Sequence, residues 1–159
     1  MNLLSPTQSC TTAADFVNFS NWRYYSNGSW VTDATTATAI VSDVSADFSV
    51  VLNPLKNDYV LVHGGTFLAP AIQFYRATSP TGPFTFGASF DLSTYTNEAS
   101  DYQNYFYYAQ SAHGNLSYGG DSGGLMISYV RSSNNAADTT NPTVYVPRFV
   151  NLPWSQIDP

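Results

Sequence analysis

Short extended segments separated by strong turn signals dominate this chain. Runs rich in Val, Ile, Phe and Tyr occupy residues 48–52, 58–63 and 71–76, and each is followed by a proline- or glycine-containing turn. β-Branched and aromatic residues favour strands, whereas proline and glycine end a strand or reverse the chain. No segment keeps the 3.6-residue apolar spacing of an amphipathic helix. The sequence therefore predicts an all-β protein of antiparallel strands with short connections.

The predicted strands form two groups, and each group has the pattern of one antiparallel meander. Polar segments at residues 91–101 and 132–142 are predicted loops. Repetition of one small sheet is typical of β-propellers, in which a blade takes about 40–50 residues. We therefore predict β-propeller-like meander sheets that correspond to about two to three blades. The predicted strands are residues 48–52, 58–63, 71–76 and 84–86 in the first group, and 105–110, 112–116, 125–131 and 144–152 in the second.

A separate hairpin is predicted before the first meander. Two short aromatic runs at residues 22–25 and 29–31 flank Asn27-Gly28, a dipeptide preferred in two-residue hairpin turns. A short apolar run at residues 37–41 is expected to pair with the strands that follow.

The composition excludes several classes of function. Charged residues make up 10% of the chain, and its five basic residues form no cluster, so we predict no nucleic-acid partner. No apolar run approaches the length needed to cross a membrane. A single cysteine, Cys10, excludes an intramolecular disulfide and a cysteine-based metal site. We predict no metal and no cofactor. Sequons at Asn18, Asn27 and Asn115 favour a secreted, extracellular protein.

Residues 120–124 read Gly-Asp-Ser-Gly-Gly, the nucleophile motif of chymotrypsin-like serine proteases. That chemistry needs a histidine base beside the serine, an orienting aspartate and backbone donors for the oxyanion. His113 and His63 both lie too close to Ser122 in the sequence to leave room for the two barrels of that family. A glycine-rich turn between two neighbouring strands explains the motif better, and a serine protease is the least favoured alternative.

Four stretches in a fixed order resemble the five-bladed β-propeller families of arabinanase-like glycoside hydrolases and related uncharacterised secreted proteins. The first reads AIQFYRATSPTGPFTF, a strand followed by the turn that these families place between strands. The sequence departs from them at Ala112-His113-Gly114, where they commonly have Ala-His-Pro. The resemblance covers about residues 36–152, and its stretches are residues 71–86, 108–113, 125–134 and 145–149.

The resemblance implies a partial five-bladed propeller that acts on carbohydrate. Enzymes of the arabinanase type are inverting hydrolases, which use one carboxylate as general base and another as general acid. We predict Asp47, Asp101 and His113 as catalytic residues. Two of them have an alternative role, since Asp43 and Asp47 flank a turn that they would cap, and His113 would equally suit a hydrogen-bonded core position. Glu98 is expected to be a solvated loop residue.

Tyr107, Tyr145 and Arg148 are the predicted substrate-binding residues. Aromatic ring faces suit the C–H surfaces of sugars, and an arginine pairs with a carboxylate or a substrate hydroxyl, although Arg148 would also serve as an edge charge. The leading functional hypothesis is a glycoside hydrolase. The alternative is a non-catalytic carbohydrate-binding or structural propeller segment.

The predicted organisation is a lead-in with a hairpin over residues 1–35, followed by one domain of blades over residues 36–159. A five-bladed propeller needs more blades than this length holds. The blade edges left exposed in a partial propeller would favour self-association.

Overall fold

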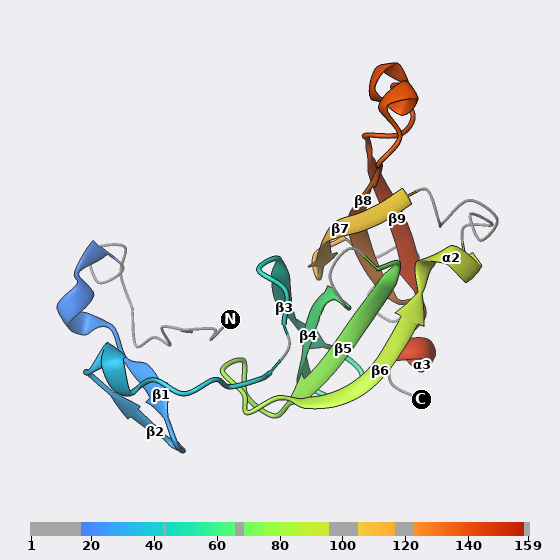
Figure 1. The fold of residues 1–159 in the computed structure, drawn as a ribbon. Coiled ribbons are helices and arrows are strands. Elements are labelled where there is room, and N and C mark those ends of the chain that lie inside the picture. Colours follow the sequence, from blue (N-terminus) through green and yellow to red (C-terminus); the bar gives the residue numbers. More distant parts are fainter. Residues whose placement is uncertain (1–16, 43, 66–68, 96–104, 117–122, 158–159) are drawn as a thin grey trace.

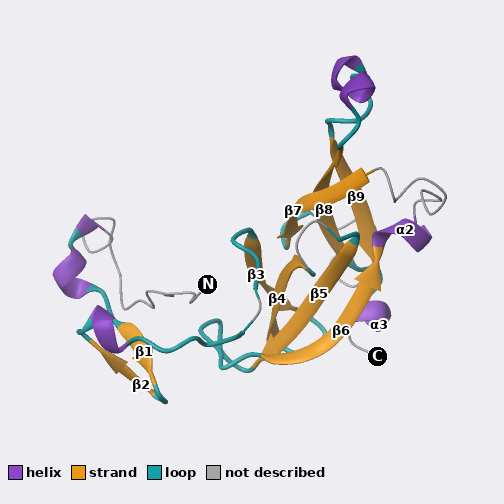
Figure 2. Cartoon of the chain, viewed as in Figure 1, coloured by secondary structure: helices purple, strands orange, loops and turns teal. Residues whose placement is uncertain are grey.

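A computed structural model describes residues 17–42, 44–65, 69–95, 105–116 and 123–157. In these residues the chain forms nine strands in three antiparallel sheets, with only short helical turns between them, as Figure 2 shows. The prediction of an all-β protein with antiparallel sheets is therefore confirmed. No helix in the described residues is both long and apolar enough to span a bilayer.

The first large sheet is a four-stranded meander in the order β3-β4-β5-β6 (Figure 1). Every pair of neighbours is antiparallel, as predicted. The last strand continues well beyond Phe86, and a helical turn then lies within the segment predicted as a loop with a helical turn as an alternative. The elements are β3 (Phe48–Asn53), β4 (Asp58–Gly64), β5 (Ala71–Ala77), β6 (Thr85–Asp91) and α2 (Leu92–Tyr95).

Both faces of this sheet are covered. Val60 and Val62 on β4 face one hydrophobic core, whereas Leu61 between them faces a second core on the other side. Val41 and Val44 pack into this second core. The apolar run at residues 37–41 therefore lies over the face of the sheet and forms no strand, so the prediction that it would pair with its neighbours was wrong.

The second large sheet has three strands in the order β7-β8-β9. Residues 105–110 and 112–116 were predicted as separate strands, but residues 105–113 form one continuous strand with a bulge. The pairing of this strand with the next one along the chain agrees with the prediction. The turn between them was predicted at residues 118–124, of which 118–122 lie outside the described residues. The strands are β7 (Tyr105–His113), β8 (Leu125–Ser133) and β9 (Pro147–Leu152).

Two short helices flank β9. The first, η4, lies in the predicted loop, and the strand begins later than the predicted residue 144 because Asn141, Thr143 and their neighbours form a turn. The second, α3, packs against β6 of the other sheet and buries Trp154 and Ile157. The bounds are η4 (Ala136–Thr140) and α3 (Trp154–Ile157).

The main core lies between the two large sheets. Strand β7 contacts both β3 and β4, and the Ala112 backbone N–H donates to Ser49 Oγ across the two sheets at 2.7 Å. Each large apolar side chain buried in such a core contributes about 1.5–3 kcal/mol relative to exposure. The core residues are Val60, Val62, Ile72, Phe74, Leu92, Tyr107, Ala112, Leu125, Ile127, Tyr129, Val150, Leu152, Trp154 and Ile157.

The third sheet is the predicted hairpin, and it stands apart from the two larger sheets in Figure 1. Asn27 and Gly28 both have positive φ, 47° and 92°, as a two-residue turn of type I′ requires. The Tyr25 and Trp30 rings pack edge to face at 5.2 Å. Its elements are η1 (Phe19–Asn21), β1 (Tyr24–Ser26), β2 (Ser29–Val31) and η2 (Ala34–Thr36).

Candidate functional site

His113 is the last residue of β7, and the bulge in that strand decides which way it points. In a regular strand, residues 107 and 113 would share one face of the sheet. Ala109 has a φ of 56°, and the register shifts between Tyr108 and Ser111. As a result Tyr107 and Ala112 face the core, and His113 faces outward on the same side as Tyr108.

The His113 side chain is half-buried and has one close polar partner. Its Nε2 atom lies 2.8 Å from Ser128 Oγ on β8. Its ring centre is 6.2 Å from the Phe149 ring on β9, and the strand register places Phe149 opposite Ser128. The alternative prediction for His113 was a hydrogen-bonded position in the core. His113 is hydrogen-bonded, but it lies at the surface of the sheet and outside the core.

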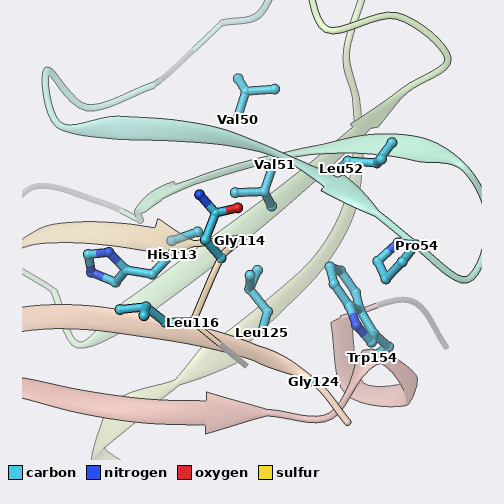
Figure 3. Close-up of a pocket in the computed structure, with 12 residues that line it drawn as sticks. Val50, Val51, Leu52, Pro54, His113, Gly114, Leu116, Gly124, Leu125 and Trp154 are labelled. Carbon is cyan, nitrogen blue, oxygen red and sulfur yellow. The ribbon is translucent and has the colours of Figure 1, made fainter. Parts of the chain in front are cut away.

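A groove of about 740 Å³ runs between the ends of β3 and β7 (Figure 3). Most of its lining residues have apolar side chains, although more polar than apolar surface is open to it, and no carboxylate lines it among the described residues. In Figure 3 the His113 ring points away from Trp154, which lies across the groove. The backbone at His113 thus borders the groove, whereas its ring belongs to the outer face of the three-stranded sheet. The lining residues are Val50, Val51, Leu52, Pro54, Ala112, His113, Gly114, Asn115, Leu116, Gly124, Leu125 and Trp154.

The outer face of the β7-β8-β9 sheet carries a set of rings that we call the aromatic face. Tyr145 and Phe149 are its most exposed members, at 68% and 57% of their surface. Tyr108 lies between Phe106, at 5.8 Å, and Tyr145, at 6.4 Å, measured between ring centres. The aromatic face consists of Phe106, Tyr108, His113, Tyr145 and Phe149.

Hydrogen-bonding groups lie among these rings. Ser111 and Ser128 face each other on neighbouring strands, and Asn151 follows two residues after Phe149 on the same face of β9. Removal of Tyr108 from water raises the pKa of its phenol to about 12, assisted by a hydrogen bond that its O–H donates to Tyr145 and by electrostatic repulsion from Tyr145. Tyr108 is therefore protonated and uncharged at neutral pH.

A smaller pocket lies beside Tyr145. It measures about 230 Å³ and is lined by Ser132, Ser133, Asp138, Val144 and Tyr145. Ser133 Oγ donates to Asp138 Oδ2 at 2.6 Å, which anchors the η4 helix to the end of β8. Among the described residues, Asp138 in this pocket is the carboxylate that lies next to the aromatic face.

The predicted catalytic residues are not brought together in the described residues. Asp47 is exposed in the turn before β3, where its backbone oxygen accepts a hydrogen bond from Ser45 Oγ at 2.6 Å. It does not line the groove beside His113. Asp101 lies outside the described residues, as do Asp43, Glu98 and Ser122. In the described part of the chain no group of three His, Cys, Asp or Glu side chains has the arrangement of a metal site.

The predicted substrate-binding residues fall in three different environments. Tyr107 is 1% exposed and packs against Tyr129 in the core, so its side chain is not accessible to a substrate. Arg148 donates from Nη2 to the Thr143 backbone oxygen at 3.0 Å and holds the turn before β9. Tyr145 alone of the three presents an open ring.

Sequence reasoning missed the roles of Ser128, Phe149 and Asp138. The alternation of β9, with Val150 and Leu152 buried, would have placed Phe149 on the outer face. No comparable signal marks Asp138, because its position beside Tyr145 depends on how η4 folds back onto the end of β8.

Comparison with protein families gives a match over most of the chain. A family model described as a domain of unknown function, DUF5005, matches residues 11–154. The match therefore includes the β1-β2 hairpin together with both larger sheets. A search of curated proteins found no match.

Proposed function

The chain belongs to the DUF5005 family, and from the geometry of the aromatic face we propose that it is a non-catalytic carbohydrate-binding protein of the β-propeller type. One observation carries the proposal. The exposed ring of Phe149 lies beside the His113–Ser128 pair, and in the described residues neither member of that pair is hydrogen-bonded to a carboxylate.

The chemistry of these groups suits a sugar. The face of an aromatic ring carries partial negative charge and attracts the C–H groups on one side of a sugar ring. The hydroxyl groups at the sugar's edge then meet the polar side chains around Phe149. His113 Nδ1 has no hydrogen-bond partner in the described residues and is available to a sugar hydroxyl.

The order of the strands supports the propeller assignment. Consecutive antiparallel meanders stacked face to face are what neighbouring blades of a propeller require. The first strands of the two sheets, β3 and β7, contact each other, as strands next to a central channel would. The resemblance of residues 36–152 to five-bladed propellers agrees with this arrangement.

Hydrolysis is the second candidate, and the same resemblance favours it. An inverting glycosidase needs two carboxylates about 6.5–9.5 Å apart on either side of the scissile bond. Asp47 would have to pair with a residue such as Asp101, which lies outside the described residues. We rank binding first because open aromatic rings lie beside hydrogen-bonding groups on this sheet, which is what a sugar-binding surface needs.

An extracellular location would accompany this function. The sequon asparagines Asn18, Asn27 and Asn115 are all exposed, so all three are open to glycosylation in a secretory pathway. A loss of mass after endoglycosidase treatment of protein secreted from a eukaryotic host would support this location.

The test is binding to a panel of arabinans and other plant and microbial polysaccharides, measured by affinity electrophoresis. We expect Phe149→Ala to weaken binding at least about tenfold, which is the effect of losing a central aromatic contact. Phe86→Ala is the matched control, because Phe86 on β6 is equally exposed, at 58%, and lies on the other sheet.

Two results would decide against the proposal. Wild-type protein that retains no polysaccharide of the panel would contradict carbohydrate binding. Release of reducing sugars, abolished by Asp47→Ala and Asp101→Ala, would favour the hydrolase.

A further inference from the structure

The aromatic face has two separate polar regions, and only one of them surrounds Phe149. The other is the small pocket beside Tyr145, which contains the Asp138 carboxylate and the hydroxyls of Ser132 and Ser133. Tyr145 leaves 68% of its surface open at the mouth of this pocket. A ring beside hydrogen-bonding groups therefore occurs twice on one face of the sheet.

We propose that the pocket beside Tyr145 is a second sugar subsite, and that the ligand is a neutral oligosaccharide chain rather than a single sugar. This inference rests on the proposed carbohydrate-binding function. At the second subsite the Tyr145 ring stacks on one sugar unit, and the Asp138 carboxylate accepts hydrogen bonds from its hydroxyls.

The register of β8 sets the separation of the two subsites. Ser128 lies opposite Phe149, whereas Ser132 lines the pocket beside Tyr145. The distance from Ser128 to Ser132 along a strand is roughly 13 Å, given a rise of about 3.3 Å per residue. A single sugar does not bridge that distance, so a ligand that uses both subsites has several linked units.

Rings continue across the space between the subsites. Tyr108 lies opposite Val130, midway between Ser128 and Ser132 on β8, and its ring contacts Tyr145. The uncharged Tyr108 phenol offers one more hydroxyl along the path. The Tyr108 ring therefore lies between the two subsites along β8 and next to Tyr145.

Charge restricts the type of chain. The protein has a net charge of −6, and the ionisable acidic group of the second subsite is the Asp138 carboxylate. A polymer of uronic acids would bring more negative charge to this face, which costs binding energy. Neutral chains avoid this repulsion, and we expect them to bind in preference.

The experiment compares short and long sugars by isothermal titration calorimetry, using the disaccharide and hexasaccharide of neutral arabinan, xylan and cellulose. We expect the hexasaccharide of the preferred series to bind wild-type protein at least about tenfold more tightly than the disaccharide. Tyr145→Ala and Asp138→Ala should remove this preference for the hexasaccharide over the disaccharide. Tyr145→Phe keeps the aromatic ring and should therefore preserve most of the preference for the hexasaccharide.

The outcomes separate this inference from the proposed function. If Tyr145→Ala and the Phe86→Ala control leave the length preference equally intact, the second subsite is wrong and carbohydrate binding at Phe149 stands. If the wild-type protein binds none of these sugars, both proposals fail. If Tyr145→Ala instead abolishes self-association seen by light scattering and leaves sugar binding unaltered, the face around Tyr145 docks a second copy of the chain, and the subsite is likewise wrong.

Discussion

His63 is the fully buried ionisable residue of the four-stranded sheet. Its Nδ1 atom accepts a hydrogen bond from the Ser45 backbone N–H at 3.4 Å, and its ring lies 5.5 Å from the ring of Tyr75. Burial lowers the pKa of the imidazole, against a smaller opposing effect of a backbone hydrogen bond at Gly64. The neutral ring is therefore favoured in the folded state, and a proton on Nδ1 would remove the bond that holds the segment before β3.

This pKa shift predicts a loss of stability in acid. The unfolded chain takes up a proton at His63 near pH 6.5, whereas the folded chain does so only at lower pH. The His63 contribution is thus complete above about pH 6.5 and falls as the pH drops toward the folded-state pKa. The melting temperature should fall between about pH 7 and about pH 5, and this fall should be smaller for His63→Gln than for wild type. An equal loss in His63→Gln and in wild type would refute the prediction.

At the scale of the element, the bulge in β7 has the largest effect on the site. A continuous regular strand would turn His113 toward the core with Tyr107. The bulge inserts extra backbone at Ala109, so Tyr107 before it and Ala112 after it both face the core. The same irregularity places His113 beside Phe149, and the composition of the candidate site follows from it.

Ala109→Val should therefore be more costly than an ordinary surface substitution. A φ of 56° is in the left-handed region, which a β-branched side chain tolerates poorly. We expect a loss of about 1–2 kcal/mol in the free energy of unfolding, measured by urea denaturation. Ser111→Val, on extended backbone in the same strand, should change stability by less than about 0.5 kcal/mol. Equal effects of the two changes would show that the bulge carries no conformational constraint.

At the scale of the whole molecule, one core joins the two larger sheets. Tyr107 on β7 packs against Tyr129 on β8 and belongs to the same cluster as Val60 and Val62 on β4. Loss of Tyr107 would therefore open the layer between the sheets. The helical turn α3 closes the same core with Trp154 and Ile157.

Tyr107→Ala should destabilise the protein by about 3–5 kcal/mol, as large-to-small changes of buried aromatic residues do. Tyr145→Ala, at an exposed ring, should cost less than about 1 kcal/mol. Urea denaturation followed by fluorescence and circular dichroism measures both changes. A small effect of Tyr107→Ala would mean that the two sheets do not share one core.

Most strands could be predicted from local patterns. The alternation in residues 71–76 and the apolar runs at residues 48–52 and 58–63 reflect side chains that pack on a sheet, and such patterns are present in the sequence itself. The Asn27-Gly28 turn was predictable for the same reason, since its two residues adopt positive φ at low cost. The candidate site was less predictable. Of its proposed binding residues, Tyr145 lies on the open face, whereas Tyr107 is in the core.

The sequence by itself determined that the chain forms antiparallel strands, where most of them lie and that a hairpin precedes them, because strand propensity and turn conformation depend on neighbouring residues. Only the tertiary structure decided which side chains reach the surface. One bulged residue in β7 reverses the direction of every side chain after it, and the fold of η4 brings Asp138 to Tyr145. Both depend on contacts between residues distant in sequence, and no local pattern contains that information.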